Sequence, residues 1–357
     1  MGNLAGRVAD PGLYLQKYDF EAGVAVFRDM TRDSFRQSSF LDSRIVSPTA
    51  RTHTFALDEV LDSVPSPEPA RLLFHTAYCC STLMSRALDV AGSTLVYREP
   101  VHLHQLAVAR RRADDFPRYV SARWGELLRF SMSMLSKGWH AGERSIIKPT
   151  DSCNNIIADI LSLHENSRAV LLYAQADDFI AANLKSAGRR MFMRRFVGRA
   201  LRDNMLDRHS ELHSLQVGDL TEAQLAAYVW MTQVRSYNSA LDALPHRCVC
   251  VDSATLLDNA RCVLSESSDF LGLGLDAQVL ASIMQSGIWN KHAKDTSKQY
   301  TSAERQREMA SLMSHIGPEV NAGLEWIERF DGWKRTVRYA RELNCRPDPG
   351  GTGVARA

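Results

Sequence analysis

The segment Arg71–Pro100, RLLFHTAYCCSTLMSRALDVAGSTLVYREP, constrains the fold more than any other part of the chain. It opens with the apolar run RLLFHTA, passes through a loop of small residues at Cys79–Thr82, and ends in a second apolar run, Ser93–Val96. A helix-like stretch, Thr82–Val90, connects the two. This order predicts a βαβ unit. Because a helix start offers free backbone N–H groups, the loop is predicted to bind a phosphate or sulfate.

The rest of the chain alternates short apolar runs with longer amphipathic stretches. Buried strands are predicted at Ser145–Lys148, Ala169–Tyr173 and Arg247–Val251. Asp151 is predicted to be the N-cap of the helix that follows the first of these strands. Helices are predicted at Val101–Arg112, Phe116–Lys137, Asn155–His164, Asp177–Ser186, Thr221–Ala243, Ala260–Phe270, Ala277–Ser286, Ser302–Ile316, Val320–Arg329 and Trp333–Leu343. Such alternation predicts a three-layer α/β/α sandwich around a mainly parallel sheet, with large helical insertions.

Three prolines within Val64–Pro69 mark the clearest boundary, because proline fixes φ and restrains the residue before it. The predicted order is a lead-in packed on the core (1–69), a main domain (70–345) and a disordered tail (346–357). Within the lead-in, strands are predicted at Gly23–Phe27 and Thr52–Ala56, and a helix at Thr31–Ser39.

Composition narrows the class of protein. The net charge of +2 over 357 residues gives no reason to expect nucleic-acid or membrane binding. No signal-peptide pattern occurs at Met1–Pro11, and no apolar run approaches the roughly 18 residues that span a bilayer. The seven cysteines include no CxxC pair, so they are expected to be reduced thiols and no metal site is predicted. We therefore expect a soluble, cytoplasmic protein.

Four stretches, in order, resemble the P-loop sulfotransferase-like superfamily, and within it the bacterial sulfotransferase-family proteins of unknown substrate. HTAYCCSTL at His75–Leu83 is similar to the 5′-phosphosulfate loop, and YREPVHL at Tyr97–Leu103 lies where many members place an acidic catalytic residue. Lys148–Thr150 resembles a conserved third-strand element, and CVDSATLL with DFLGL resembles the late-strand region. The resemblance implies a P-loop NTPase-like fold, 3′-phosphoadenylyl sulfate as donor, adenosine 3′,5′-bisphosphate as product and a small-molecule acceptor.

The chain departs from the family pattern at the donor site. His75 and Thr76 stand where the family has proline and a basic residue, and Cys80 stands where glycine is usual. The arginine and serine that usually hold the 3′-phosphate are replaced by Ala174 and Ala182. The lysine of a complete Walker A motif is also missing, which speaks against an ATP-dependent kinase.

Candidate catalytic residues follow the ends of predicted strands, where ligands bind in open α/β sheets. Glu99 could accept a proton from the acceptor, or could be a solvated carboxylate paired with Arg98. Lys148 could stabilise developing charge, or could be an exposed lysine before a turn. His102 is a third catalytic candidate with His104 as its alternative, although a structural role is the simpler expectation for either one.

Candidate donor-binding residues lie in three places. The loop contributes Thr76, Tyr78, Cys79, Cys80, Ser81 and Thr82, although Ser81 and Thr82 would also suit an ordinary helix cap. The basic stretch Lys185–Arg202 contributes Arg190, because an arginine fork matches phosphate. A late basic segment, which the family resemblance implies closes over the nucleotide, contributes Lys291, His292 and Lys294.

The hypothesis from the sequence is therefore a sulfotransferase-like enzyme that moves a sulfuryl group to a small hydroxyl or amine acceptor. Two alternatives remain open at this point. One is a non-catalytic relative that binds a nucleotide or metabolite, and the other is a transferase that uses a different phosphorylated donor. The sequence is also compatible with a homodimer.

Overall fold

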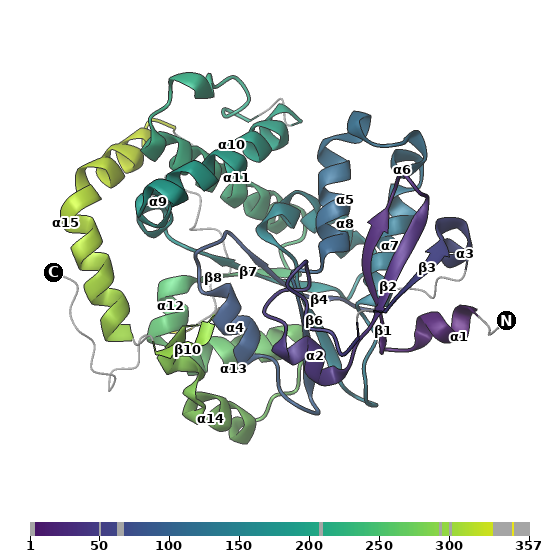
Figure 1. The fold of residues 1–357 in the computed structure, drawn as a ribbon. Helices are drawn as coiled ribbons and strands as arrows, with labels where there is room; N and C mark the ends of the chain where they lie inside the picture. Colours follow the sequence, from purple (N-terminus) through teal and green to yellow (C-terminus); the bar gives the residue numbers. More distant parts are fainter. Residues whose placement is uncertain are drawn as a thin grey trace.

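The computed structural model describes residues 4–49, 51–62, 68–206, 210–292, 295–299 and 302–330 together with Cys345. Its centre is a five-stranded sheet with the order β5-β6-β4-β7-β8, in which all neighbours are parallel (Figure 1). These strands are β4 (Arg71–His75), β5 (Thr94–Arg98), β6 (Arg144–Lys148), β7 (Arg168–Tyr173) and β8 (Cys248–Asp252). Each lies where an apolar run predicted it, so the predicted α/β fold class is confirmed.

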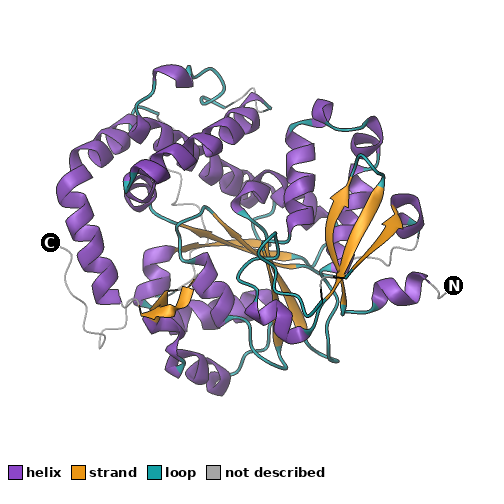
Figure 2. Cartoon of the chain, in the orientation of Figure 1, coloured by secondary structure: helices purple, strands orange, loops and turns teal. Residues whose placement is uncertain are grey.

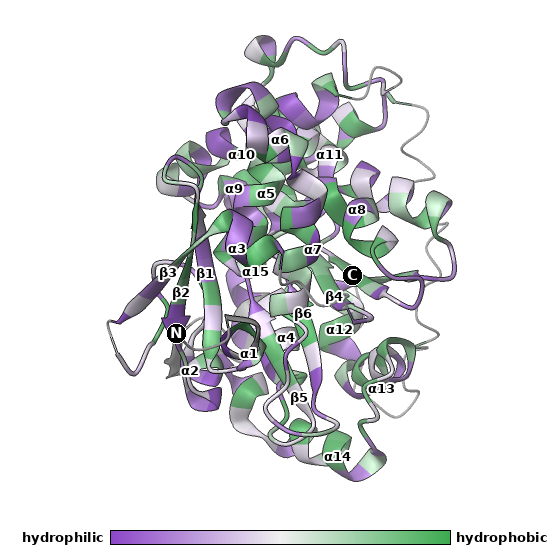
Figure 3. Cartoon of the chain, turned by 90° about the vertical axis from the view of Figure 1, so that its right-hand side faces the viewer, coloured by the Kyte–Doolittle hydropathy of each residue, from purple (hydrophilic) through white to green (hydrophobic). Residues whose placement is uncertain are grey.

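Helices cover both faces of this sheet (Figure 2). Alternate strand residues point to opposite faces, so Leu72 and Phe74 enter one hydrophobic core while Leu73 enters the other. One core is covered by α5 (Val101–Arg111), α7 (Trp124–Met134) and α8 (Ile157–Ser162). The opposite face is covered by α4 (Ser81–Ala87), α12 (Ser253–Asp258), α13 (Ala260–Leu271) and α14 (Ala277–Gln285). Figure 3 shows hydrophobic residues gathered where the helices meet the sheet.

A further group of helices extends the second core beyond the sheet. It consists of α9 (Ala176–Leu184), α10 (Ala187–Met205), α11 (Glu222–Ala243) and α15 (Ser302–Ile327), which pack against one another. The long helix α11 begins with a capping box in which Thr221 and Gln224 bond reciprocally. The shorter connecting elements are α6 (Arg118–Ala122), η1 (Ala113–Asp115), η2 (Asp151–Ile156), η3 (Val217–Asp219), η4 (Gly287–Asn290), β9 (Lys291–His292) and β10 (Asp295–Gln299).

The lead-in is an antiparallel sheet with the order β1-β2-β3, formed by β1 (Leu13–Asp19), β2 (Val24–Asp29) and β3 (Thr52–Ala56). The helices α1 (Leu4–Ala9), α2 (Arg32–Gln37) and α3 (Leu57–Leu61) accompany it. Its aromatic residues Tyr14 and Phe35 pack against Tyr97 of β5. The buried Arg98 also donates to the carbonyl oxygens of Phe35 and Ser38. The lead-in therefore shares the first core with the main sheet.

Several sequence predictions differ from the structure. Strand β1 is not among the predicted elements, and the predicted helix Phe116–Lys137 is divided into α6 and α7. Helix α15 runs unbroken through Pro318, where two helices were predicted, because its packing on α9 and α11 supports it across the missing N–H. The predicted helix Trp333–Leu343, most of the Val64–Pro69 boundary and the predicted tail lie outside the described residues.

The expectation that every cysteine is a free thiol is wrong. Cys262 of α13 and Cys345 form a disulfide, and their Cα atoms are 5.7 Å apart, as this bond requires. Disulfides are typical of oxidising compartments, so the cysteine argument for a cytosolic location no longer holds. Among the described helices, none is long and apolar enough to cross a membrane.

Candidate functional site

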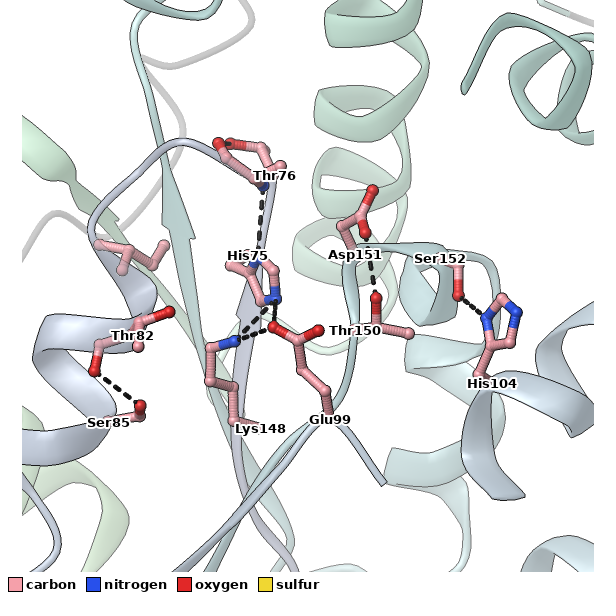
Figure 4. Close-up of polar contacts among 12 residues, drawn as sticks. His75, Thr76, Thr82, Ser85, Glu99, His104, Lys148, Thr150, Asp151 and Ser152 are labelled. Atoms are coloured by element: carbon pink, nitrogen blue, oxygen red, sulfur yellow. Dashed lines mark hydrogen bonds and ion pairs between the residues drawn. The ribbon is translucent and has the colours of Figure 1, made fainter. Parts of the chain in front are cut away.

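Three charged or titratable residues meet at the carboxyl edge of the main sheet. His75 is the last residue of β4, Lys148 is the last residue of β6, and Glu99 directly follows β5. The sheet order places β6 between β5 and β4, so Lys148 lies between the other two side chains. Figure 4 shows the three pointing toward one another. We refer to His75, Glu99 and Lys148 as the edge cluster.

Close contacts hold the edge cluster together. The Lys148 Nζ atom lies 2.5 Å from Glu99 Oε1 and 3.1 Å from His75 Nε2, and His75 Nε2 lies 3.6 Å from Glu99 Oε1. The Lys148 side chain is 1% exposed and that of Glu99 18%. Burial alone would raise the pKa of Glu99, but Lys148 and His75 outweigh it and hold this pKa well below its ordinary value. Glu99 is therefore a firmly ionised carboxylate in the structure described here.

His75 is a neutral imidazole in this environment. Burial lowers the pKa of His75, the Lys148 charge lowers it further, and the Glu99 carboxylate only partly opposes them. The Ala77 amide donates to His75 Nδ1 at 3.2 Å. The Nε2 atom faces both other members of the edge cluster, 3.1 Å from Lys148 Nζ and 3.6 Å from Glu99 Oε1. The loop after β4 thus orients the ring toward the carboxylate.

The loop after β4 has an unusual backbone. Ala77, Tyr78 and Cys80 all have left-handed φ angles, of 67°, 54° and 59°. Glu99 also has a positive φ, of 55°, and its amide donates to the Lys148 carbonyl oxygen at 2.6 Å. Non-glycine residues in this region are strained by about 1–2 kcal/mol each, and such strain is concentrated at functional sites. The family pattern has glycine only at the position of Cys80.

The predicted donor-binding residues of the loop have different surroundings. Thr76 is fully buried, and its hydroxyl accepts a hydrogen bond from the Ala174 amide at 3.1 Å. Cys79 is buried as well, and burial raises the pKa of its thiol to about 11, so it is protonated at neutral pH. Ser81 and Thr82 form the first turn of α4 and are largely buried, and Cys80 is half-buried.

A second polar group lies next to the edge cluster. Asp151, the first residue of η2, forms an ion pair with Arg199 of α10 and accepts a hydrogen bond from the Thr150 hydroxyl at 3.1 Å. Burial raises the pKa of Asp151, but Arg199 more than offsets this, and the net pKa is low. His104 contacts the Ser152 hydroxyl at 2.5 Å. The prediction that Asp151 caps a helix is wrong, since its carboxylate is engaged by Arg199.

The end of β7, on the other side of β4, is neutral. The Ala174 amide donates to Thr76, and the Ala174 carbonyl oxygen accepts from the Trp230 indole Nε1 at 2.9 Å. Ala174 is fully buried. The Trp230 side chain from α11 therefore closes the place where the family resemblance implies a 3′-phosphate contact. Neither Ala174 nor Trp230 carries a charge.

The remaining predicted site residues lie apart from the edge cluster. His102 is fully buried against the rings of Tyr14 and Tyr18, and burial lowers its pKa to about 3. The structure does not bring His102 to the site, because its side of α5 faces the aromatic core under the lead-in.

The predicted donor contacts outside the loop are also separate from it. Arg190 is engaged by Glu222 and Glu319, which raise its pKa, so its guanidinium is already paired. Lys291 is exposed in the short strand β9. His292 belongs to the same strand, and its side chain and the whole of Lys294 lie outside the described residues. Tyr78 packs on Phe179, and the Arg189 guanidinium lies 4.7 Å above the Tyr78 ring centroid.

Sequence reasoning missed His75, Asp151 and Arg199 as parts of the site. His75 ends an apolar run exactly as Lys148 does, so the same strand-end signal could have identified it. Asp151 and Arg199 are 48 positions apart in the sequence, and only the tertiary fold brings them together. In the part of the chain that the structure describes, no group of three or more His, Cys, Asp or Glu residues could hold a metal ion.

The fold and the site define an α/β protein with a charged cluster at the carboxyl edge of a parallel sheet. No protein-family model matches the sequence, and no curated protein matches it significantly. The chain is similar to the solved sulfotransferase domain of the curacin biosynthetic pathway, with 13% identity over 71% of this chain and 99% of that one, at a TM-score of 0.38. A sulfotransferase from Mycobacterium avium gives 12% identity, 72% and 79% coverage and a TM-score of 0.37.

A sulfotransferase from Alicyclobacillus acidocaldarius is similar at 14% identity, with 75% of this chain and 99% of that one covered and a TM-score of 0.33. Similarity at this level carries no argument about donor, acceptor or reaction, which depend on the site itself.

Proposed function

We propose that this protein is a sulfotransferase-like enzyme that moves a sulfuryl group from a nucleotide phosphosulfate donor to a hydroxyl or amine of a small molecule. The observation that supports this most is the convergence of His75, Glu99 and Lys148 at three neighbouring strand ends. A fixed cation, a carboxylate and an imidazole are brought together beside a strained loop that follows the central strand. The cation can stabilise negative charge on a leaving group, and the carboxylate or imidazole can accept the proton of the acceptor.

The proposed reaction is an in-line displacement at sulfur. The acceptor oxygen or nitrogen forms a bond to sulfur, and the bond between sulfur and the donor's bridging oxygen breaks. The acceptor's proton passes to a base on the protein, and the electron pair of the broken bond stays on the leaving phosphate. Lys148 stabilises the negative charge that develops there, and its burial strengthens this interaction.

Glu99 is the proposed base, and its ion pair with Lys148 makes its activity depend on the donor. With its pKa held far below the ordinary value, the carboxylate is a poor proton acceptor. An anionic donor competes for the Lys148 ammonium, which weakens the pair and raises the pKa of Glu99 toward its ordinary value. His75 lines the same space, with its Nε2 atom 3.6 Å from Glu99 Oε1 and 3.1 Å from Lys148 Nζ. Proton transfer would therefore be favoured only once the donor is bound.

The residues present fit the 5′-phosphosulfate end of 3′-phosphoadenylyl sulfate better than its 3′-phosphate end. The loop after β4, with Ser81 and Thr82 at the start of α4, is the proposed contact for the 5′-phosphosulfate. At the end of β7, Ala174 and Trp230 offer no charge for a 3′-phosphate. This observation favours the second candidate function, a transferase that uses a different phosphorylated donor.

Binding and turnover together test the proposal. The four ligands for calorimetry are 3′-phosphoadenylyl sulfate, adenosine 3′,5′-bisphosphate, 5′-AMP and ATP. Each of the first three should bind more tightly than ATP. Incubation of the sulfated donor with hydroxyl and amine acceptors should then release the desulfated nucleotide. No binding of any of the four would overturn the proposal and favour a non-catalytic role. Glu99→Gln that binds donor with unchanged turnover would remove the base role from Glu99.

A further inference from the structure

The outer face of α10 combines exposed apolar and basic side chains. Met191 is 71% exposed and Phe192 46%, and at the other end of the helix Met205 is 65% and Leu206 66% exposed. These four are among the five large hydrophobic side chains that are exposed in the described part of the chain, the fifth being Val46. Four exposed apolar side chains along one helix and its C-cap form a cluster, unlike the single exposed apolar residues that are common on protein surfaces.

Basic side chains occupy the same face. At 100° per residue, Met191, Arg195, Arg202 and Leu206 fall within one strip directed away from the buried Met193, Val197 and Ala200. Arg194, with a side chain that is 70% exposed, borders this strip. We call the exposed residues Met191, Phe192, Arg194, Arg195, Arg202, Met205 and Leu206 the α10 outer face. Asp203 is directed inward, where it pairs with Arg111.

The charge of this face is available to a partner. No described acidic side chain forms an ion pair with Arg195 or Arg202, and Arg194 has only a 3.6 Å contact with Glu222. The Arg195 guanidinium instead lies 5.7 Å from the centroid of the Phe192 ring. The net charge of the whole chain is only +2, so the positive charge here is a local feature.

We propose that the α10 outer face binds the surface of an anionic phospholipid bilayer. A helix of 19 residues is roughly 28 Å long, enough to lie along a bilayer surface. Apolar side chains flanked by arginines along such a face suit the boundary between acyl chains and anionic headgroups. Figure 3 shows the same mixture, with apolar positions set among hydrophilic ones along α10. Long, flexible methionine and leucine side chains can enter this boundary.

Two other side chains of the same helix reach the candidate site. Arg199 pairs with Asp151 beside the edge cluster, and Arg189 lies over Tyr78 of the loop after β4. The docking proposal itself rests on the exposed residues of α10 and does not depend on the reaction that the site catalyses.

Vesicle flotation with the full chain tests this inference without an activity assay. Vesicles of equal parts phosphatidylcholine and phosphatidylglycerol should carry the protein upward, whereas pure phosphatidylcholine should bind at least about tenfold less. Raising the salt from about 0.1 M to about 1 M should release the protein, because the screening length falls from about 10 Å to about 3 Å. No binding to the anionic vesicles at the lower salt would overturn the proposal.

Paired variants separate the two components of the face. Arg195→Gln with Arg202→Gln, and separately Met191→Ser with Met205→Ser, should each weaken partitioning about tenfold. Val46→Ser is the matched apolar control, because Val46 is exposed elsewhere, and Arg110→Gln is the basic control. All of these changes are at exposed positions, and circular dichroism would verify that each variant folds.

Three other outcomes would reassign the surface. Binding that both controls weaken as much as the α10 variants would show general charge attraction. Self-association in analytical ultracentrifugation that the α10 variants abolish, without flotation, would assign the face to a second copy of the chain. Equal competition by duplex DNA would assign the arginines to polyanions in general.

Discussion

Two parts of one sheet edge differ sharply in this protein. At the ends of β5, β6 and β4 lies a buried, charged cluster, whereas the end of β7 is closed by the neutral Ala174 and Trp230. Beyond the backbone pairing of β4 with β7, the Ala174 amide joins the two parts through its bond to the Thr76 hydroxyl. Under the proposed function, this difference leaves one place for an anionic group, next to Lys148, and none across β4.

The largest effect is expected from removing the cation of the charged part. Lys148→Met leaves the Glu99 carboxylate without its partner in a buried site, which should lower the free energy of unfolding by about 3–5 kcal/mol. Turnover should fall by roughly 10²-fold or more, because the charge on the leaving group loses its stabilisation. Urea denaturation and a donor-dependent assay measure the two effects.

Lys137 provides a matched control for that variant. It is a half-buried lysine whose ammonium donates to the carbonyl oxygens of Val8, Asp10 and Leu13 beneath the lead-in. Lys137→Met should destabilise the fold and leave donor affinity unchanged. If both lysine variants lower donor affinity equally, the charged edge is no more than a structural ion pair.

A smaller effect is expected from the pH dependence of the Glu99 interaction. Because its pKa is lowered in the folded state, Glu99 contributes stability that is fully present above the unfolded pKa of about 4.3 and is lost as the pH falls further. Wild type should exceed Glu99→Gln by about 1.5–3 kcal/mol at neutral pH. The gap should shrink steadily from about pH 4.3 downward. Denaturation curves in which the gap is constant from neutral pH into acid would contradict the assigned ion pair.

The bond that joins the two parts should contribute less. Thr76→Val leaves the buried Ala174 amide without an acceptor, which should cost about 1–3 kcal/mol. Thr76→Ser keeps the hydroxyl and should recover most of that loss. Thermal denaturation of the two variants measures the difference, and equal melting temperatures would show that the hydroxyl is not the link.

The strand ends of the charged part could be predicted from the sequence, but their contacts could not. Glu99 and Lys148 each follow an apolar run, and parallel strands bring such positions to one edge. Their ion pair depends on β6 lying between β5 and β4, and no local pattern encodes that order. His75 ends its strand in the same way. The family motif has proline at this position, so the motif gives no signal for a histidine.

For the neutral part at the end of β7, the absence of a charged side chain could be predicted, but the packing of Trp230 could not. Ala174 and Ala182 could be identified through the family resemblance, which implies an arginine and a serine at these positions. That an indole from α11 would occupy this place depends on long-range packing between α11 and the end of β7. The ion pair between Asp151 and Arg199 has the same origin, since helical periodicity places Arg199 on α10 but does not say which loop it meets.

The smallest expected effect is a difference in nucleotide affinity. It tests most directly whether the end of β7 lacks a contact for a 3′-phosphate. An arginine that binds a 3′-phosphate forms charge-assisted hydrogen bonds, and losing them costs about 1.5–3 kcal/mol, or roughly tenfold to a hundredfold in affinity. With Ala174 and Trp230 at that place, adenosine 3′,5′-bisphosphate and 5′-AMP should bind with dissociation constants within about threefold of each other. Calorimetric titration measures the ratio. A ratio above about tenfold would mean that a cation from elsewhere reaches the 3′-phosphate. Arg189→Gln would then be the decisive variant, because Arg189 already lies over Tyr78 of the loop and its loss should return the ratio to near one.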